Sequence, residues 1–451
     1  MTSSENYLAK SVAGTFGVVA ALLILSFIPE FDFFSFHFRP VNILADVQLK
    51  ENPKPTLDTA KKIRPVFADT CKQGLVCIED YSSDTSGLSS FLQALDSSGL
   101  RKVRIAWFGD SFVEGDIFLD PLRDTLQAIY GGSGVGFVPI SSEVAGFRQT
   151  ISHTFSGWNS SSIIGEKTKS HPLGFAGSVF WPSSKAMVKY AAVKKRRLSN
   201  FEQASLFLYT ANNNGIYVNG TYKSISASNS IQKLSIGNNL KSLELEFSDS
   251  IPLDVYGVSL ESKTGLAVDN FSMRGNSGIG LSYVSSAVFK RMSEIHSPDL
   301  VVLSYGLNVA NPKSNSYDWY VRSMTKTILM IKESFPNSSI LLIGCPDRGE
   351  NKDGVYQTMR GVNELIQVQR KMAAETGICF WDMHEAMGGD STMIKWGSMK
   401  KHPYANKDYT HLTFYGGEKM ANITAGTIFY EKEKYDRKKS MLNSNKSTND
   451  K

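Results

Sequence analysis

Cysteine is scarce in this sequence, with four residues among 451. Their spacing resembles no zinc-binding pattern, so the sequence predicts no zinc site. Cys71 and Cys77 enclose the short loop KQGLV and could close a small disulfide in an oxidising compartment. Cys345 and Cys379 each border an apolar, strand-like run, and we expect both to be buried free thiols.

The sequence also lacks a large excess of charge of either sign, with 49 Lys and Arg against 43 Asp and Glu residues. The net charge is +6, and about half of it comes from the last 21 residues, which show no apolar period. We expect residues 436–451 to be disordered. A surface basic enough to bind nucleic acid is not indicated. The run KKRR (194–197) is either a solvated loop or a contact for an anionic glycan.

Near the N-terminus stands an uncharged apolar run, SVAGTFGVVAALLILSFI (11–28), which is just long enough to span a bilayer. Lys10 precedes the run and acidic residues follow it, which predicts that residues 1–10 face the cytoplasm. We interpret 11–29 as an uncleaved signal anchor, with a cleaved signal peptide as the alternative. The rest would then lie in the periplasm or another extracytoplasmic space, after a polar stalk over 30–85.

The remainder of the chain has enough apolar residues to fold, with 41% hydrophobic and 20% charged residues. Buried strands are predicted at 299–305, 338–345 and 378–383, and amphipathic helices at 281–296, 316–334 and 356–376. This alternation is typical of a doubly wound (flavodoxin-like), three-layer α/β/α domain, here over 86–144 and 263–435. Residues 145–262 show alternating runs such as SLELEF between Asn/Gly turns, which predicts an inserted β-sandwich.

One short stretch, WFGDSFVEGD (107–116), joins an apolar run to a helical pattern. Gly109, Asp110 and Ser111 would form the turn at the carboxyl end of a buried strand, where open α/β sheets bind ligands. By itself the tripeptide is an ordinary turn. A nucleophilic serine also needs a base, a group that orients the base, and donors for the oxyanion.

Later segments supply candidates for each of these parts. In NKDYTHLTFYGG, Asp408 precedes His411 by three residues, so its carboxylate can reach Nδ1 and leave Nε2 free as a base. A capping aspartate beside a surface histidine is the alternative. Gly275 in SMRGNSG and Asn308 in SYGLNVANP each follow a strand-like run and could donate to an oxyanion.

The order of these segments resembles the four blocks of the SGNH (GDSL-like) hydrolases, over about 100–140 and 265–430. The resemblance implies Ser111 as nucleophile, His411 as base and Asp408 as its orienting group. It further implies the Ser111 amide, Gly275 and Asn308 as oxyanion donors, with Gly109, Asp110 and Gly306 supporting the motifs. Such chemistry needs neither a metal nor an organic cofactor.

A narrower resemblance rests on YGGSGVGFVP (130–139) and the β-rich insertion, and it is to the peptidoglycan O-acetylesterases of bacterial envelopes. It implies a carbohydrate-binding-like insertion, an O-acetylated glycan as substrate and an acyl-serine intermediate. Two alternatives remain open: an O-acetyltransferase with the same triad, and a non-catalytic glycan-binding scaffold. Four aromatic residues of the insertion could stack on sugars or belong to its core: Trp158, Phe175, Phe180 and Trp181.

Overall fold

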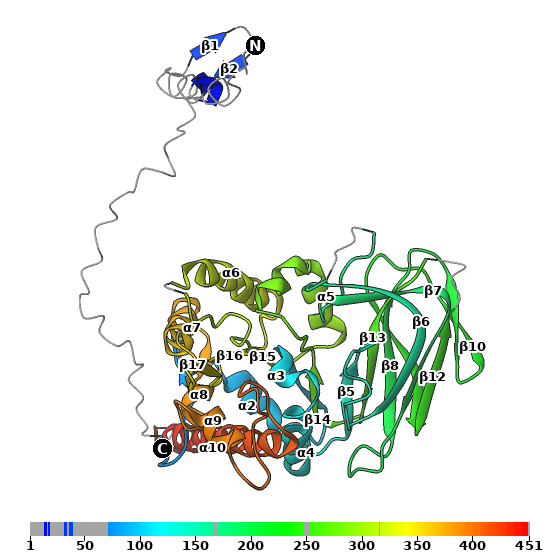
Figure 1. Ribbon diagram of the computed structural model, residues 1–451. Coiled ribbons are helices and arrows are strands. Elements are labelled where there is room, and N and C mark those ends of the chain that lie inside the picture. The colour runs from blue at the N-terminus through cyan, green and yellow to red at the C-terminus, as the bar shows by residue number, and fades with distance from the viewer. Residues whose placement is uncertain are drawn as a thin grey trace, which may run out of the picture. The chain divides into compact units, whose positions relative to one another are not determined.

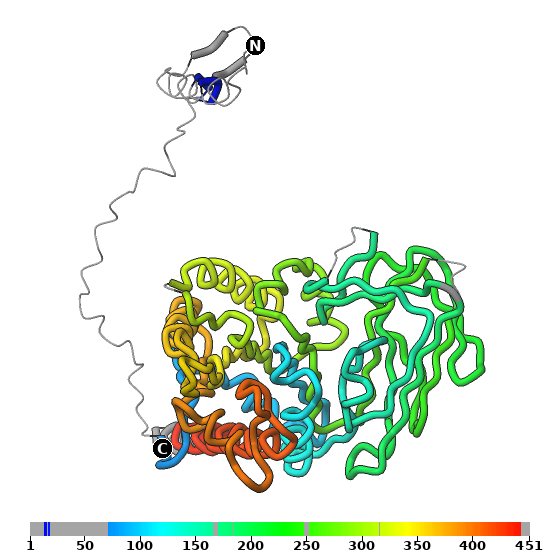
Figure 2. Tube along the Cα trace, viewed as in Figure 1, coloured from blue at the N-terminus to red at the C-terminus, as the bar shows by residue number. Residues whose placement is uncertain are grey.

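The computed structural model describes residues 71–165, 170–247, 252–314 and 316–449, together with short stretches between residues 13 and 38. Residues 1–63 and 64–451 are separate compact units. In the first unit, β1 (Phe31–Phe33) pairs with β2 (Phe36–Phe38). The α/β domain and the insertion belong to the second unit (Figures 1 and 2).

Six strands form the central sheet of the α/β domain. Their order is β14 (Gly265–Asn270), β4 (Lys102–Gly109), β15 (Leu300–Ser304), β16 (Ser339–Ile343), β19 (Cys379–Trp381) and β3 (Glu79–Asp80). All neighbours are parallel except β3, which pairs antiparallel with β19. Among the parallel strands, β4 comes first in the chain and lies between β14 and β15, which are the second and the third. This confirms the predicted flavodoxin-like, doubly wound sheet.

Helices cover both faces of this sheet (Figure 1). One layer contains α2 (Ser89–Leu95), α4 (Leu119–Tyr130) and α10 (Phe414–Asn449), and the other contains α5 (Ser286–Ile295), α6 (Asp318–Ser334) and α7 (Val362–Thr376). Shorter helical turns follow several strands: α3 (Ser111–Glu114), η1 (Ile279–Tyr283), α8 (Met383–Met387) and α9 (Thr392–Gly397). The central strands β4, β15 and β16 are buried except for Lys102 at the start of β4, as expected for strands covered on both faces.

The inserted domain is a strongly bent sheet of nine strands that encloses its own core. The strands are β5 (Gly134–Val138), β6 (Ser152–Ser162), β7 (Ser178–Ala191), β8 (Phe201–Tyr209), β9 (Asn214–Val218), β10 (Thr221–Ile225), β11 (Gln232–Leu240), β12 (Ser242–Phe247) and β13 (Asp254–Glu261). One layer holds β5, β13, β8 and β11, and the other holds β6, β7, β12, β9 and β10. The two layers join where Val255 pairs with Phe180. The predicted β-rich insertion is present as a two-layered unit.

The chain leaves the α/β domain after α4 and returns through β13, as the tube in Figure 2 traces. The insertion begins earlier than predicted, because β5 lies before residue 145 yet pairs with β13. Strand β5 was not predicted because its sequence, GVGFV, is rich in glycine, which is depleted in strands. The predicted stalk ends earlier too, since β3 and the Cys71–Cys77 disulfide lie within 30–85.

Two further expectations were wrong. Residues 349–358 form the hairpin of β17 (Gly349–Lys352) and β18 (Val355–Thr358), so α7 begins at Val362 and not at 356. Residues from 436 are helical to Asn449, where the sequence predicted disorder. Lys439, beyond the predicted end of the fold, pairs with Asp96 after α2 and gives this last part of α10 a contact with the domain.

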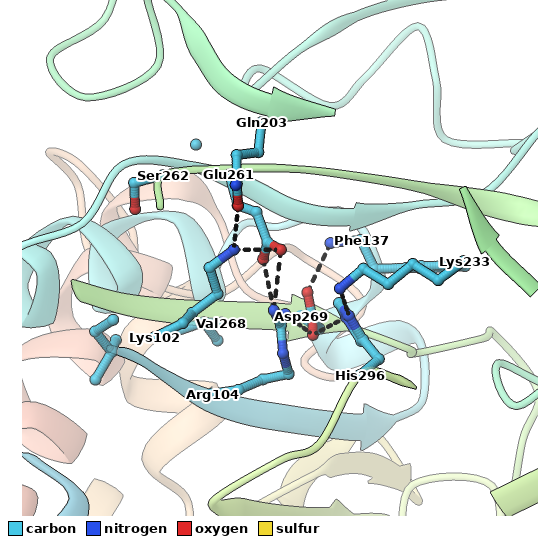
Figure 3. A network of polar contacts seen from close by, with 12 residues as sticks. Lys102, Arg104, Phe137, Gln203, Lys233, Glu261, Ser262, Val268, Asp269 and His296 are labelled. Atoms are coloured by element: carbon cyan, nitrogen blue, oxygen red, sulfur yellow. Dashed lines mark hydrogen bonds and ion pairs between the residues drawn. The ribbon is translucent and has the colours of Figure 1, made fainter. Parts of the chain in front are cut away.

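A buried polar network joins the insertion to the α/β domain (Figure 3). Arg104 on β4 contacts Asp269 on β14 at 2.6 Å and Glu261 on β13 at 2.8 Å. His296, just after α5, lies 2.8 Å from Asp269 through Nε2 and 3.1 Å from Lys233 of β11 through Nδ1. Because three of the five elements are in one domain and two in the other, the network sets how the domains dock.

Cysteine placement agrees with the sequence. Cys71 and Cys77 form a disulfide, while Cys345 and Cys379 are free and buried. The predicted anchor at 11–29 falls outside the described residues except for 13–15, 17 and 18. Among the residues that the structure does describe, no helix has the length and apolar character needed to cross a membrane.

Candidate active site

The GDS turn lies at the carboxyl end of the central strand β4. Strand β4 ends at Gly109, and Ser111 begins α3 one residue after the cap. A Cβ atom on Gly109 would lie 2.9 Å from Ser272 Oγ and 3.3 Å from the Ser304 carbonyl, so glycine lets three chain segments meet here. Asp110 is buried, and its Oδ1 accepts a hydrogen bond from the Phe112 amide at 3.0 Å. The turn is thus held rigidly under the serine.

Three residues far apart in the sequence meet at this turn. Ser111 Oγ lies 3.0 Å from His411 Nε2, and His411 Nδ1 lies 2.7 Å from Asp408 Oδ2. The second carboxylate oxygen accepts the amides of Thr410 and His411, at 2.9 and 3.0 Å. With the His411 side chain 40% exposed, the site is open to solvent. This arrangement matches a nucleophile, a base and an orienting carboxylate.

The hydrogen bonds keep Asp408 ionised. Partial burial by itself would raise the pKa of this carboxyl, but the bonds from His411 and from the two backbone amides outweigh burial and lower it below its ordinary value. Asp110, by contrast, has its pKa raised to about 7, chiefly because it is buried. Two carboxylates near one serine therefore differ in their state near neutral pH, and only Asp408 contacts the histidine.

The segment after β16 supports the site in a way that the sequence did not reveal. Arg348 donates from Nη1 to the carbonyl of Leu307 at 2.6 Å, and the Gly349 amide donates to the carbonyl of Tyr409 at 2.8 Å. Leu307 is adjacent to Asn308, and Tyr409 lies between Asp408 and His411. Residues 348–349 thus connect the predicted oxyanion loop to the base loop. No motif marks them in the sequence.

The predicted oxyanion residues lie on the loops that follow β14 and β15. Gly275 has φ +76°, a left-handed conformation that favours glycine. Gly306 has φ +153°, and a Cβ there would lie 2.4 Å from Cys345 Cβ. Asn308 Nδ2 donates to the Asn276 carbonyl at 3.0 Å, which ties the two loops together. That Gly275 and Asn308 bind an oxyanion stays a prediction.

The insertion contacts the segment that follows the catalytic turn, but it supplies none of Ser111, His411 and Asp408. Asp116, shortly after Ser111, is buried and contacts Arg148 at 2.7 Å and Arg123 at 3.2 Å. Arg148 lies between β5 and β6. Asn270 donates to the Val113 carbonyl at 3.0 Å and to Asp116 at 2.9 Å. One ion-pair cluster therefore fixes the end of α3 to both domains.

A cavity of about 310 Å³, with a lining that is partly apolar and partly polar, opens between the insertion and the catalytic loops. Glu114 and Arg274, which form an ion pair at 2.9 Å, line it on the α/β side. Hydroxyl groups line it on the insertion side: Ser141, Ser142, Ser160, Ser161, Ser162 and Ser178. Arg274 immediately precedes Gly275, so this cavity adjoins the predicted oxyanion loop. Among the residues described, no cluster of three or more His, Cys, Asp or Glu could hold a metal ion.

The aromatic residues singled out in the insertion are largely internal. Phe175 and Phe180 are buried in the two cores, and the Trp158 indole donates to the Met187 carbonyl at 2.9 Å. Trp181 stacks on His171 with centroids 3.9 Å apart. These contacts favour the core alternative over sugar stacking.

In the KKRR run, two residues bridge the domains. Lys195 pairs with Asp120 at 3.1 Å and Arg197 pairs with Asp124 at 2.5 Å, both on α4. The run is thus partly a contact between the insertion and the α/β domain, which neither sequence alternative anticipated.

Comparison with known proteins gives a structural match. No protein-family model matches the chain, and no curated protein matches it by sequence. A solved peptidoglycan O-acetylesterase is 24% identical with a TM-score of 0.67, and the match covers 79% of this chain and 99% of that one. A family two carbohydrate esterase from Cellvibrio japonicus (11% identity, TM-score 0.26, covering 62% of this chain and 99% of that one) and a GDSL-like lipase from Bacteroides thetaiotaomicron (17%, 0.25, 38% and 76%) are matched far more weakly. The first match shows a fold shared over most of the chain.

Proposed function

The chain has the SGNH hydrolase fold, and from that premise we propose that it is a serine esterase that removes O-acetyl groups from a cell-envelope glycan, with peptidoglycan as the substrate. The observation that carries the proposal is the assembled relay from Ser111 through His411 to Asp408. A scaffold without catalysis would have no need of this alignment, so the relay argues against the purely binding alternative.

Each proposed step transfers a proton to or from His411, while Asp408 stays ionised and orients the imidazole. His411 Nε2 takes the proton of Ser111 Oγ as that oxygen attacks the acetyl carbonyl carbon. The carbonyl oxygen becomes an oxyanion, for which the amides of Ser111 and Gly275 and the Asn308 side chain are the proposed donors. When the carbon–oxygen bond to the sugar breaks, the imidazolium returns the proton to the sugar oxygen. A water then attacks the acetyl-serine with His411 again as base, releasing acetate and restoring Ser111.

Three features support a glycan ester over a lipid ester. The triad is open, since the Asp408 and His411 side chains are 48% and 40% exposed, which leaves room for a polymer. The cavity beside the oxyanion loop has serine hydroxyl groups and charged side chains among its apolar lining, and these can hydrogen-bond to the hydroxyl groups of a sugar. The matched solved structure is itself a peptidoglycan O-acetylesterase, which makes peptidoglycan the glycan to test first.

The test is acetate release from O-acetylated peptidoglycan, measured beside acetylated xylan and a long-chain lipid ester. Release from peptidoglycan should be fastest, and Ser111→Ala and His411→Ala should each lower it by several orders of magnitude. The double variant should be scarcely worse than either single one, because the groups act as a unit. An organophosphonate should label Ser111. Acetylated sugar appearing in place of free acetate would instead indicate the O-acetyltransferase alternative.

We further propose that residues 11–29 anchor the protein in the inner membrane and that the catalytic domain lies in the periplasm. The uncharged run at 11–28 supports the anchor. The Cys71–Cys77 disulfide supports an oxidising location for the second unit. O-acetylated peptidoglycan would be accessible from that side of the membrane.

A further inference from the structure

Two exposed phenylalanines lie beside the triad and have no part in the mechanism above. Phe147 is 48% exposed and Phe414 is 42% exposed. Their rings stack on each other, with centroids 5.4 Å apart and planes inclined by 29°. A large exposed apolar surface is costly in water and commonly marks a binding site. The two rings come from different domains, because Phe147 lies between β5 and β6 and Phe414 begins α10.

Both rings are held close to the catalytic residues. A Cβ atom on Gly115 would lie 2.7 Å from Phe147 Cε1, and Gly115 caps the four-residue helix that begins with Ser111. Phe414 follows His411 by three residues, which places their Cα atoms within about 11 Å of each other. Arg148, next to Phe147, is fixed by its buried contact with Asp116.

The exposed face of the ring pair suits a sugar ring. Tyr415, the next residue along α10, is 48% exposed and contacts His402, with ring centroids 4.3 Å apart. A pyranose has an apolar C–H face and polar edges, and an aromatic ring attracts the weakly positive hydrogens of that face. A site for a long acyl chain would instead need a continuous apolar groove.

We propose that Phe147 and Phe414 form an aromatic platform that binds a neighbouring sugar of the glycan chain while the acetylated sugar lies at Ser111. This inference rests on the proposed function and deepens it. The platform holds the polymer across the boundary between the domains. It also explains why the segment before β6 reaches the site although it carries none of the four motif blocks.

The experiment compares the kcat/KM for O-acetylated peptidoglycan with that for a small aryl acetate in Phe147→Ala, Phe414→Ala and wild-type protein. The ratio of polymer to aryl acetate kcat/KM should fall about tenfold in each variant, mainly through a higher KM for the polymer. Phe147→Trp should restore the ratio, and Phe147→Leu should not. Phe155→Ala is the matched control, because Phe155 is 37% exposed on β6, and it should leave both rates unchanged.

Several outcomes would overturn the platform. A proportional loss on both substrates, with or without a lower thermal stability, would show that the rings only hold α3 in place. An unchanged ratio would show that they do not contact the polymer, and a selective loss on a long-chain acyl ester would identify an acyl site. In each case the wild-type protein still releases acetate from the glycan. Failure of the proposed function is distinct, because the wild-type protein would then release none.

Discussion

Asp110, next to the nucleophile, has a pKa that the fold raises towards neutral pH. Burial raises its pKa to about 7, against an ordinary value near 4. Between about pH 4 and pH 7, Asp110 therefore keeps its proton in the folded chain and loses it in the unfolded chain. The resulting stabilisation is full below about pH 4 and is lost as the pH rises through 7, a change on the order of 4 kcal/mol. The opposing influences of His411 and Arg348 are already part of that pKa.

Asp110→Asn removes this titration and keeps an acceptor for the Phe112 amide. We expect the stability of the variant relative to wild type to rise between pH 4 and pH 7. Urea unfolding of both proteins at the two pH values measures the difference. Parallel curves at both pH values would contradict the raised pKa.

Gly306 illustrates a residue whose absent side chain matters. A Cβ there would come within 2.4 Å of Cys345 Cβ and 2.6 Å of its sulfur, and the backbone has φ +153°. Gly306→Ala should therefore cost about 3 kcal/mol or more and displace the loop that carries Asn308, lowering activity with stability. Gly354→Ala is the control, because Gly354 also has positive φ but no neighbour within 4 Å. Equal stability losses in the two variants would mean that backbone strain at positive φ, and not the contact with Cys345, causes the loss.

At the residue level, the sequence predicted those site residues that belong to a recognisable motif. Ser111, Asp408 and His411 were found because their neighbours form recognisable blocks, and the structure brings them together. Arg348 and Phe147 were missed because a single arginine or phenylalanine has no pattern, and only the fold shows what each contacts. Gly275 and Asn308 lie on the loops after β14 and β15, and their role as oxyanion donors stays a prediction.

At the scale of elements, the connection after β16 holds the two active loops in register. Replacing Arg348 with methionine removes the 2.6 Å hydrogen bond to the Leu307 carbonyl. Because a hydrogen bond from a charged donor contributes about 1.5–3 kcal/mol, we expect kcat to fall roughly 10- to 100-fold with little change in KM. Arg360→Met, on an exposed residue at the start of the following loop, should leave kcat unchanged. A change confined to KM would mean that Arg348 acts on substrate binding and not on the loops.

Elements were predictable where the apolar pattern was strong and local. The parallel strands β15, β16 and β19 were found as continuous apolar runs, which is how strands buried on both faces read. Strands β5 and β3 were missed because one is rich in glycine and the other has two residues. The hairpin at 349–358 was partly taken for helix, since its pairing depends on turn residues outside the helical period.

For the molecule as a whole, the network around Arg104 is a buried contact between the two domains. Its guanidinium pairs with Asp269 and Glu261, and all three side chains are almost completely buried. Removing one partner from such a cluster leaves an uncompensated buried charge and typically costs 3–5 kcal/mol. The sequence could not reveal this, because the partners are more than 150 residues apart.

We expect Arg104→Met to lower the free energy of unfolding by about 3–5 kcal/mol and to split one urea transition into two. Tryptophan fluorescence reports both domains, since Trp158 lies in the insertion and Trp107 lies on β4. Arg101→Met is the control, because Arg101 forms a half-exposed pair with Asp299 and its loss should cost at most about 1 kcal/mol. A single transition in Arg104→Met, shifted no further than in the control, would show that the domains dock without the network.

Under the anchor proposal, the N-terminal unit determines where the protein is located and takes no part in catalysis. Residues 1–63 form a compact unit of their own, and the disulfide, both domains and the triad all lie after them. A shortened protein that starts at residue 64 and is exported behind a cleavable signal should therefore fold, release acetate at the wild-type rate from soluble glycan, and leave the membrane fraction. The full chain should stay with the inner membrane after an alkaline wash, as an integral anchor does. Failure of the shortened protein to fold, or loss of its activity on a small ester, would mean that the first unit takes part in the catalytic structure. Release of the full chain by the alkaline wash would mean that residues 11–29 do not span the membrane.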